Sequence, residues 1–224
     1  SLTNAISGTA VVKDAAGNDV TSQFTVNTTN GTLSIAARHV TVSVADAEDV
    51  EYDGSEHVSD KPVVFDGIVE GEAATITYTA ATGTAAGTYT GSYGNDFAVT
   101  AGGEDVTANY NLTTKTPGKL TITKSDATFE IALNDSTYTY DAEEHAIEPE
   151  DGKPSSTALT GTTTYSYSFE EEGEYVADLS SMTKIDAGTY TIYVKGTNPN
   201  YSEPATTTAT LKIKQRPVTF TGKS

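Results

Sequence analysis

The sequence lacks several features on which whole classes of protein depend. Among its 224 residues there is no cysteine and no tryptophan, and there are only one methionine and three histidines. The absence of cysteine excludes disulfide scaffolds, thiolate zinc sites and cysteine nucleophiles. It also favours a bacterial exported protein or a cytosolic one over a secreted eukaryotic domain. No apolar run approaches the roughly 18 residues of a membrane span, and no signal peptide opens the chain.

Basic residues are also scarce. The chain has 13 Lys and Arg against 31 Asp and Glu, which gives a formal net charge of −18. A surface this negative repels phosphate backbones and anionic lipid headgroups, so we expect no nucleic-acid partner and no peripheral docking on membranes. The same charge favours solubility and keeps neighbouring copies of a module apart, as a crowded cell exterior requires.

Threonine, tyrosine and glycine dominate what is present. There are 40 Thr, 13 Tyr and 19 Gly. Threonine and tyrosine favour the pleated, half-buried surface of a strand, and glycine supplies turns. Because no window shows a sustained apolar period of 3.6 residues, we expect no long helix. The composition therefore predicts an all-β protein.

The chain repeats itself at a spacing of roughly 87 to 91 residues, a pattern typical of modular arrays. Three landmarks carry the repeat. They are Asn18–Ile35 (returning as Glu104–Ile122 and before Ile213), Arg38–Val44 (returning at Ser125 and Arg216), and the Ala-Gly-Thr-Tyr-Thr stretch at Ala86 and Ala187. We therefore predict four segments. They are the closing part of a truncated copy (1–36), a full copy (37–124), a second full copy (125–214) and the first strand of a following copy (215–224).

Apolar and polar residues alternate inside the copies. Val40, Val42 and Val44, for example, are separated by Thr41 and Ser43. Such runs, bounded by Gly, Asn or Asp turns, indicate antiparallel sheets packed face to face. A unit of about ninety residues with roughly six to eight short strands has the size of an immunoglobulin-like sandwich. The short linker 123–126 predicts that neighbouring sandwiches pack end to end, so we expect tandem immunoglobulin-like repeats in an elongated array.

The partial copy at residues 1–36 lacks the strands needed to close a sandwich. Because an open sheet edge invites pairing, we expect it either to pack on 37–124 or to receive a strand from another chain. Residues 215–224 are the candidate donor. The alternative is that the real domain limits are a permutation of the predicted repeat limits.

The order of the landmarks resembles the MBG/YDG-type immunoglobulin-like repeats of bacterial cell-surface proteins. The elements that carry the resemblance are Arg216–Thr219, Tyr52–Gly54, Ala187–Thr191, Asn109–Tyr110 and Gly118–Ile122. In the second full copy Ala142 replaces the glycine of Tyr-Asp-Gly, so we expect that this turn does not need a positive φ in both copies. The resemblance implies an adhesin or stalk module without enzymatic activity.

The stretch that most resembles a catalytic motif is Asp53…His57. The same spacing returns at Asp141…His145, after Tyr52 and Tyr140 respectively. A catalytic site is seldom duplicated in one short chain, whereas a structural repeat duplicates everything. A catalytic site also needs a nucleophile or a substrate pocket, and neither recurs beside both pairs, so we interpret the carboxylate as an acceptor of backbone N–H bonds. We predict no catalytic, cofactor-binding or metal-binding residues, no cofactor, and no enzymatic activity.

Two other kinds of site stay open at this point. The acid-rich turns at 14–19, 46–49 and 148–151 offer oxygen ligands suited to calcium, although none matches the EF-hand pattern. A Lys–Asn isopeptide bond needs a buried lysine beside an asparagine and a protonated acid. No lysine keeps an equivalent inward position in both full copies; Lys124, for example, aligns with Gln215.

These observations favour a non-catalytic segment of a bacterial cell-surface or cell-wall protein that acts as an adhesin or as a stalk. The expected partners are an unknown host or polysaccharide ligand and the neighbouring repeats, with no membrane insertion. The alternative is a carbohydrate-binding accessory module of a secreted glycoside hydrolase. In that case a flat row of exposed tyrosines, drawn from Tyr93, Tyr165 and Tyr193, would stack on sugar rings.

Overall fold

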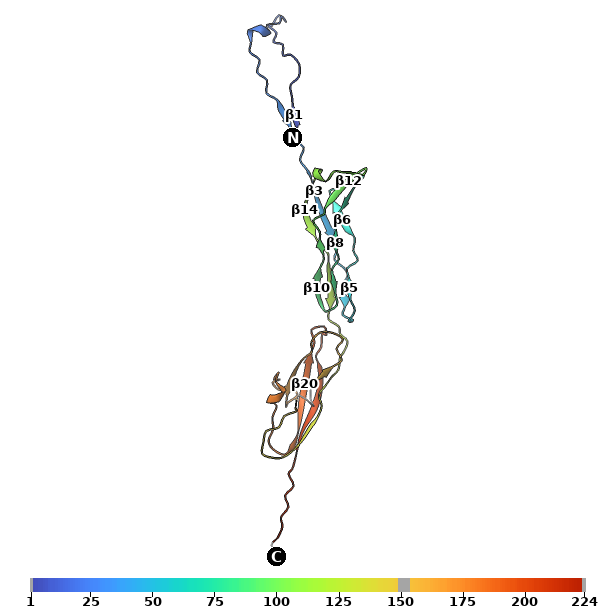
Figure 1. The fold of residues 1–224 in the computed structure, drawn as a ribbon, viewed down its shortest axis with the longest axis vertical. Coiled ribbons are helices and arrows are strands. Elements are labelled where there is room, and N and C mark those ends of the chain that lie inside the picture. Colours follow the sequence, from blue (N-terminus) through green and yellow to red (C-terminus); the bar gives the residue numbers. More distant parts are fainter. Residues whose placement is uncertain (1, 149–153, 223–224) are drawn as a thin grey trace. The chain divides into compact units, whose positions relative to one another are not determined.

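The computed structural model describes residues 2–148 and 154–222 (Figure 1). They form two compact units, of which the first comprises Ser1–Val42, Val64–Thr77 and Asn95–Lys115, and the second Ser43–Val63, Tyr78–Gly94 and Thr116–Ser224. Apart from three single-turn 3₁₀ helices, the regular structure of the described residues is β-strand. The all-β prediction is confirmed. The four predicted repeat segments remain a prediction, because the units are defined by packing.

The first unit contains two three-stranded sheets. One has the order β14 (Tyr110–Thr116), β3 (Arg38–Val44) and β6 (Val63–Asp66); the other has β13 (Glu104–Asp105), β12 (Ala98–Ala101) and β7 (Glu72–Thr75). The alternation in β3 is confirmed, since Val40 and Val42 are each 1 % exposed while Thr41 is exposed. The ring of Phe65, on β6, lies 6.1 Å from that of Phe97, which immediately precedes β12, so the two sheets approach each other at this point.

Residues 2–36 belong to the same unit but form only a small β-hairpin-like piece. Strand β1 (Leu2–Asn4) pairs with β2 (Gly31–Leu33), and the 3₁₀ helix η1 (Thr21–Gln23) lies between them. Its large apolar side chains remain exposed among the described residues. They are Leu2, Ile6, Val11, Phe24, Val26, Leu33 and Ile35. The expected contact with 37–124 and the expected strand addition from another chain both stay predictions.

The second unit contains the largest sheet, which is four-stranded. Its order is β17 (Ser136–Thr139), β21 (Ala205–Lys214), β20 (Gly188–Thr197) and β19 (Thr164–Ser168). The small sheet of β16 (Ile131–Ala132) and β18 (Ser155–Ser156) accompanies it. The unit also contains β10 (Gly87–Thr90), β15 (Lys119–Thr123) and β4 (Val50–Glu51) in one sheet, β11 (Ser92–Tyr93) with β8 (Tyr78–Thr79), and β5 (His57–Val58) with β9 (Thr82–Gly83).

Strands that correspond in the two predicted full copies pair in the same register. Tyr89 lies opposite Leu120 in β10 and β15, and Tyr190 lies opposite Leu211 in β20 and β21. The opening strands β4 and β17, however, pair in parallel with β15 and β21. Alternation does not report strand direction, which is why the sequence predicted antiparallel pairs only. A parallel pair needs a long connection, and almost a whole copy lies between these strands.

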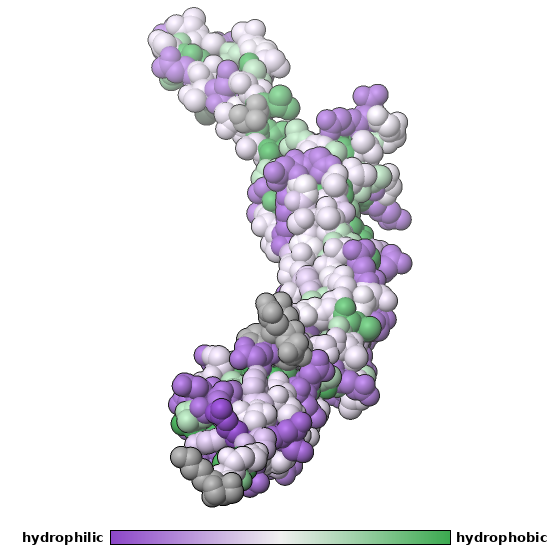
Figure 2. Space-filling model, turned by 60° about the horizontal axis from the view of Figure 1, so that its bottom comes forward, coloured by the Kyte–Doolittle hydropathy of each residue, from purple (hydrophilic) through white to green (hydrophobic). Residues whose placement is uncertain are grey.

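The core of the second unit runs without interruption through the linker between the predicted copies. One cluster of buried side chains joins Tyr52, Leu120 and Ile122 of the first copy to Phe129 and Tyr201 of the second. The Tyr201 ring lies 5.6 Å from Tyr52 and 4.8 Å from Phe129. The solvated surface is mostly polar or near neutral in hydropathy over the face drawn in Figure 2.

Candidate functional site

The two Asp–His pairs have the same geometry. His57 Nε2 lies 3.0 Å from Asp53 Oδ1, and His145 Nε2 lies 2.9 Å from Asp141 Oδ1. The backbone N–H of the residue two positions on, Ser55 or Glu143, also donates to the same carboxylate. These hydrogen bonds, the backbone one first, hold the pKa of both carboxyl groups below its ordinary value. Each pair closes a surface turn, as interpreted from the sequence.

The backbone conformation of the residue after each aspartate differs from what the sequence predicted. Gly54 has a φ of 83°, and Ala142, which replaces it in the second copy, has a φ of 74°. The expectation that this turn can dispense with positive φ in the second copy is therefore wrong. The Asp–His hydrogen bond and the Asx turn hold the backbone in place, so the alanine accepts a left-handed conformation that costs about 1 kcal/mol.

The acid-rich turns use their carboxylates internally. Asp14 accepts hydrogen bonds from the backbone N–H groups of Ala16 and Asn18, and from the Asn18 side chain. Asp46 accepts the backbone N–H of Lys119. Most of the turn at 148–151 lies outside the described residues. Within the described ranges, no three acidic or histidine side chains are grouped as a metal ion would need, and calcium binding stays untested.

The junction between the predicted copies is held by hydrogen bonds on both sides of the linker. The Ser125 N–H donates to the Asn200 carbonyl at 2.9 Å, and the Ser125 hydroxyl donates to the Glu51 carboxylate at 2.7 Å. The Tyr52 hydroxyl lies 2.8 Å from Thr160 Oγ1. Ser125 is 5 % exposed, whereas Thr123, Lys124 and Asp126 are exposed, so the linker is anchored in the junction at its serine.

Asn200 is the centre of this junction and is 0 % exposed. Its Nδ2 donates to the carbonyl and the hydroxyl of Thr160, each at 3.2 Å, and its Oδ1 accepts the backbone N–H of Ala86 at 2.9 Å. Asn198, also buried, donates to the same loop at Thr160 and Gly161. The sequence predicted close packing at the linker but did not identify these two asparagines. Their only sequence signal was the stretch Asn198–Tyr201, which belongs to the third copy of the first landmark, before Ile213.

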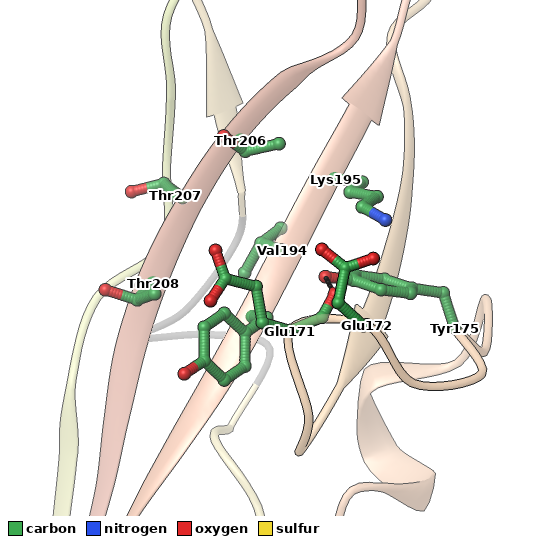
Figure 3. A pocket seen from close by; sticks show the side chains of 9 residues that line it. Glu171, Glu172, Tyr175, Val194, Lys195, Thr206, Thr207 and Thr208 are labelled. Carbon is green, nitrogen blue, oxygen red and sulfur yellow. Dashed lines mark hydrogen bonds between the residues drawn. The ribbon is translucent and has the colours of Figure 1, made fainter.

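A groove of about 390 Å³ lies in the second unit, on the outer face of β20 and β21. On this face Tyr193 lies opposite Thr208 and Lys195 lies opposite Thr206, whereas Val194 points into the core and is 1 % exposed. Figure 3 shows Glu171, Glu172 and Tyr175 on the loop that passes in front of the sheet. Acidic, basic, hydroxyl and aromatic groups therefore surround one open space.

Internal contacts hold the groove loop in place. Lys195 Nζ lies 3.9 Å from the centre of the Tyr175 ring, and the Tyr175 hydroxyl donates to the Glu171 carbonyl at 2.9 Å. The loop is also tied to β19 by the backbone hydrogen bonds between Tyr167 and Val176, both 2.8 Å long. Among the described residues, neither carboxylate of Glu171 and Glu172 has a hydrogen-bonding or ionic partner.

The three tyrosines named from the sequence do not form a flat exposed row. The Tyr93 hydroxyl donates to the Thr116 carbonyl at 3.0 Å, and its ring lies 4.8 Å from Tyr78. Burial raises the pKa of Tyr93 and of Tyr165, and Tyr165 packs against the core. Of these three tyrosines, Tyr193 alone lines the groove. The acid run Glu170–Glu174 was the sequence signal for this site, and alternation analysis passed over it.

Comparison with known proteins gives structural neighbours but no family. No family model matches the chain, and no curated protein matches it. The fibronectin(III)-like modules of Clostridium thermocellum CbhA align at 12 % identity and a TM-score of 0.29, covering 82 % of this chain and 99 % of that one. Drosophila N-cadherin EC1-3 aligns at 8 % identity and 0.28, covering 81 % and 69 %.

Immunoglobulin domains 1–4 of Sidekick-1 align at 14 % identity and a TM-score of 0.25, covering 79 % of this chain and 52 % of theirs. Identities and TM-scores this low support no functional inference. The sandwich description therefore rests on the strands, registers and buried residues given above.

Proposed function

We propose that this chain is a non-catalytic segment of a bacterial cell-surface protein, acting as an adhesin or as a stalk that spaces other domains from the envelope. The observation that carries the proposal is the junction around the buried Ser125, where one apolar core and one set of hydrogen bonds join the two predicted copies. A spacer needs neighbouring modules that do not hinge, because a hinge would let a distal domain fold back. A shared apolar core and a buried asparagine network oppose such a hinge.

The surface chemistry supports an extracellular setting. A net charge of −18 keeps neighbouring copies from associating through their exposed faces. No helix in the described ranges is long and apolar enough to cross a membrane. The duplicated Asp–His pairs close surface turns, and the proposal assigns them no catalytic role.

The rival function is a carbohydrate-binding accessory module of a glycoside hydrolase. It was expected to present a flat row of exposed tyrosines, and two of the three named tyrosines are instead committed to packing and to carbonyl contacts. The placement in a hydrolase therefore has no support from the tyrosine arrangement.

Limited trypsin digestion tests the stiff junction. Lys124 is exposed, so its side chain is accessible, but the next residue is buried and hydrogen-bonded on both sides. We expect the folded chain to resist cleavage after Lys124. The control is a variant with Gly-Ser-Gly-Ser inserted between Lys124 and Ser125, which should be cut there quickly. Equal cleavage rates in the two proteins would contradict a rigid junction.

A further inference from the structure

We propose that the groove on the outer face of β20 and β21 binds a neutral saccharide. This site is independent of the spacer role, since it lies on the side of one sandwich and uses none of the junction residues. The binding would be contributed by the Tyr193 ring, the carboxylates of Glu171 and Glu172, and Lys195.

The polar groups of the groove match sugar hydroxyls, which both donate and accept hydrogen bonds. Ionised Glu171 and Glu172 only accept, and Lys195 only donates. The hydroxyls of Thr206 and Thr208, on the same face, do both. A ligand made of hydroxyls can satisfy all of these groups at once. A purely accepting or purely donating ligand would leave part of the set unpaired.

The aromatic groups supply a flat apolar surface for the C–H face of a sugar ring. Tyr193 is half-buried at the floor, and no hydrogen bond of its hydroxyl is found among the described residues. The Tyr175 ring at the wall is fixed by Lys195 on one side and by its hydroxyl contact to the Glu171 carbonyl. A wall that is already fixed loses little entropy when a ligand binds.

The charges favour an uncharged ligand. Two carboxylates at the groove and the overall charge of −18 repel anions. A cation would be attracted by Glu171 and Glu172, but Lys195, which lies beside Tyr175 in the same groove, would repel it (Figure 3). A volume of about 390 Å³ lies within the range of small-molecule sites.

The groove is built by a segment that the first copy does not have. Tyr78 pairs with Tyr93, and Tyr167 pairs with Val194, so β8 and β19 correspond. In the first copy a short segment connects β8 to the Ala-Gly-Thr-Tyr landmark at Ala86. In the second copy a much longer loop connects β19 to the same landmark at Ala187. The position equivalent to Tyr193 is Ser92. A loop added to a retained scaffold is where binding sites are commonly found.

The test is binding of the full 224-residue chain to a panel of neutral oligosaccharides of glucose, mannose, galactose, xylose and N-acetylglucosamine, followed by calorimetric titration of each hit. We expect saturable binding to at least one class, with little dependence on salt because the ligand is neutral. Tyr193→Ser, which installs the residue of the first copy, should weaken binding at least about tenfold. Tyr193→Phe should retain it.

Two further variants make the result specific. Glu171→Gln should weaken binding, and Thr191→Ala, on the same outer face but outside the groove, should leave it unchanged. Unchanged thermal unfolding of every variant shows that the sandwich is intact. The proposal is overturned by silence across the panel, by binding that Tyr193→Ser does not affect, or by binding that prefers charged glycans and disappears with salt.

Discussion

At the scale of single residues, the duplicated turns show most clearly what repeats in this chain. Asp53 and Asp141 hold the same hydrogen bonds to a histidine and to a backbone N–H. The sequence predicted this structural role from the duplication alone. It did not predict the left-handed backbone at Ala142, because the loss of glycine from Tyr-Asp-Gly suggested a different turn.

Ala142→Gly is expected to stabilise the chain by about 0.5–1 kcal/mol, because glycine adopts a positive φ without steric cost. The reverse change in the first copy, Gly54→Ala, should destabilise it by more. A Cβ there would also meet Leu159 Cδ1 at 2.9 Å. Urea denaturation of the two variants measures both effects. A loss of stability in Ala142→Gly would contradict the strain assigned to this position.

The aspartates of these turns make stability depend on pH. Their folded-state pKa values lie below the ordinary value, so their contribution is complete above the unfolded-state pKa of about 4 and is lost as the pH falls through the folded-state pKa. We expect stability to decline below about pH 4. The double variant Asp53→Asn/Asp141→Asn should show a shallower decline, and Asp60→Asn should not. If the double variant lost stability with falling pH as steeply as the parent chain, these two turns would not be the source of the pH dependence.

At the scale of elements, strand alternation predicted the buried faces well. Val40 and Val42 in β3, and Ile192 and Val194 in β20, are buried as expected from the sequence. The direction of β4 and β17 was missed because a period of two is the same in parallel and antiparallel pairs. The groove loop was missed for another reason: it contains irregular structure and the 3₁₀ helix η3 (Leu179–Ser181), which leave no periodic pattern.

The loop contacts of Asn200 are expected to dominate the stability of the junction. Asn200→Ala removes the partner of the Ala86 N–H and one of the two donors to the Thr160 carbonyl, and an unpaired polar group inside the protein costs about 1–3 kcal/mol. We expect a loss of about 2 kcal/mol or more in urea denaturation. The exposed Asn111→Ala on β14 is the matched control and should stay within about 0.5 kcal/mol of the parent. If Asn200→Ala and Asn111→Ala lowered the free energy of unfolding equally, Asn200 would not be a special source of stability at the junction.

At the scale of the whole molecule, the account depends on whether consecutive modules act as one body. The continuous core through residues 123–126 belongs to a single compact unit, so this junction is described by the structure. The sequence predicted end-to-end packing from linker length alone, since only four residues connect the two predicted sandwiches. The chemistry of the contact, a buried asparagine network, depends on loops whose pairing only the fold reveals.

The most direct measurement is the distance distribution across this junction by double electron–electron resonance. The chain has no cysteine, so Thr88→Cys/Thr191→Cys places spin labels at only two exposed positions, one on β10 and one on β20. The spacer account predicts one narrow distance peak, which broadens when Gly-Ser-Gly-Ser is inserted between Lys124 and Ser125. A broad distribution in the parent chain, as wide as in the insertion variant, would contradict the account.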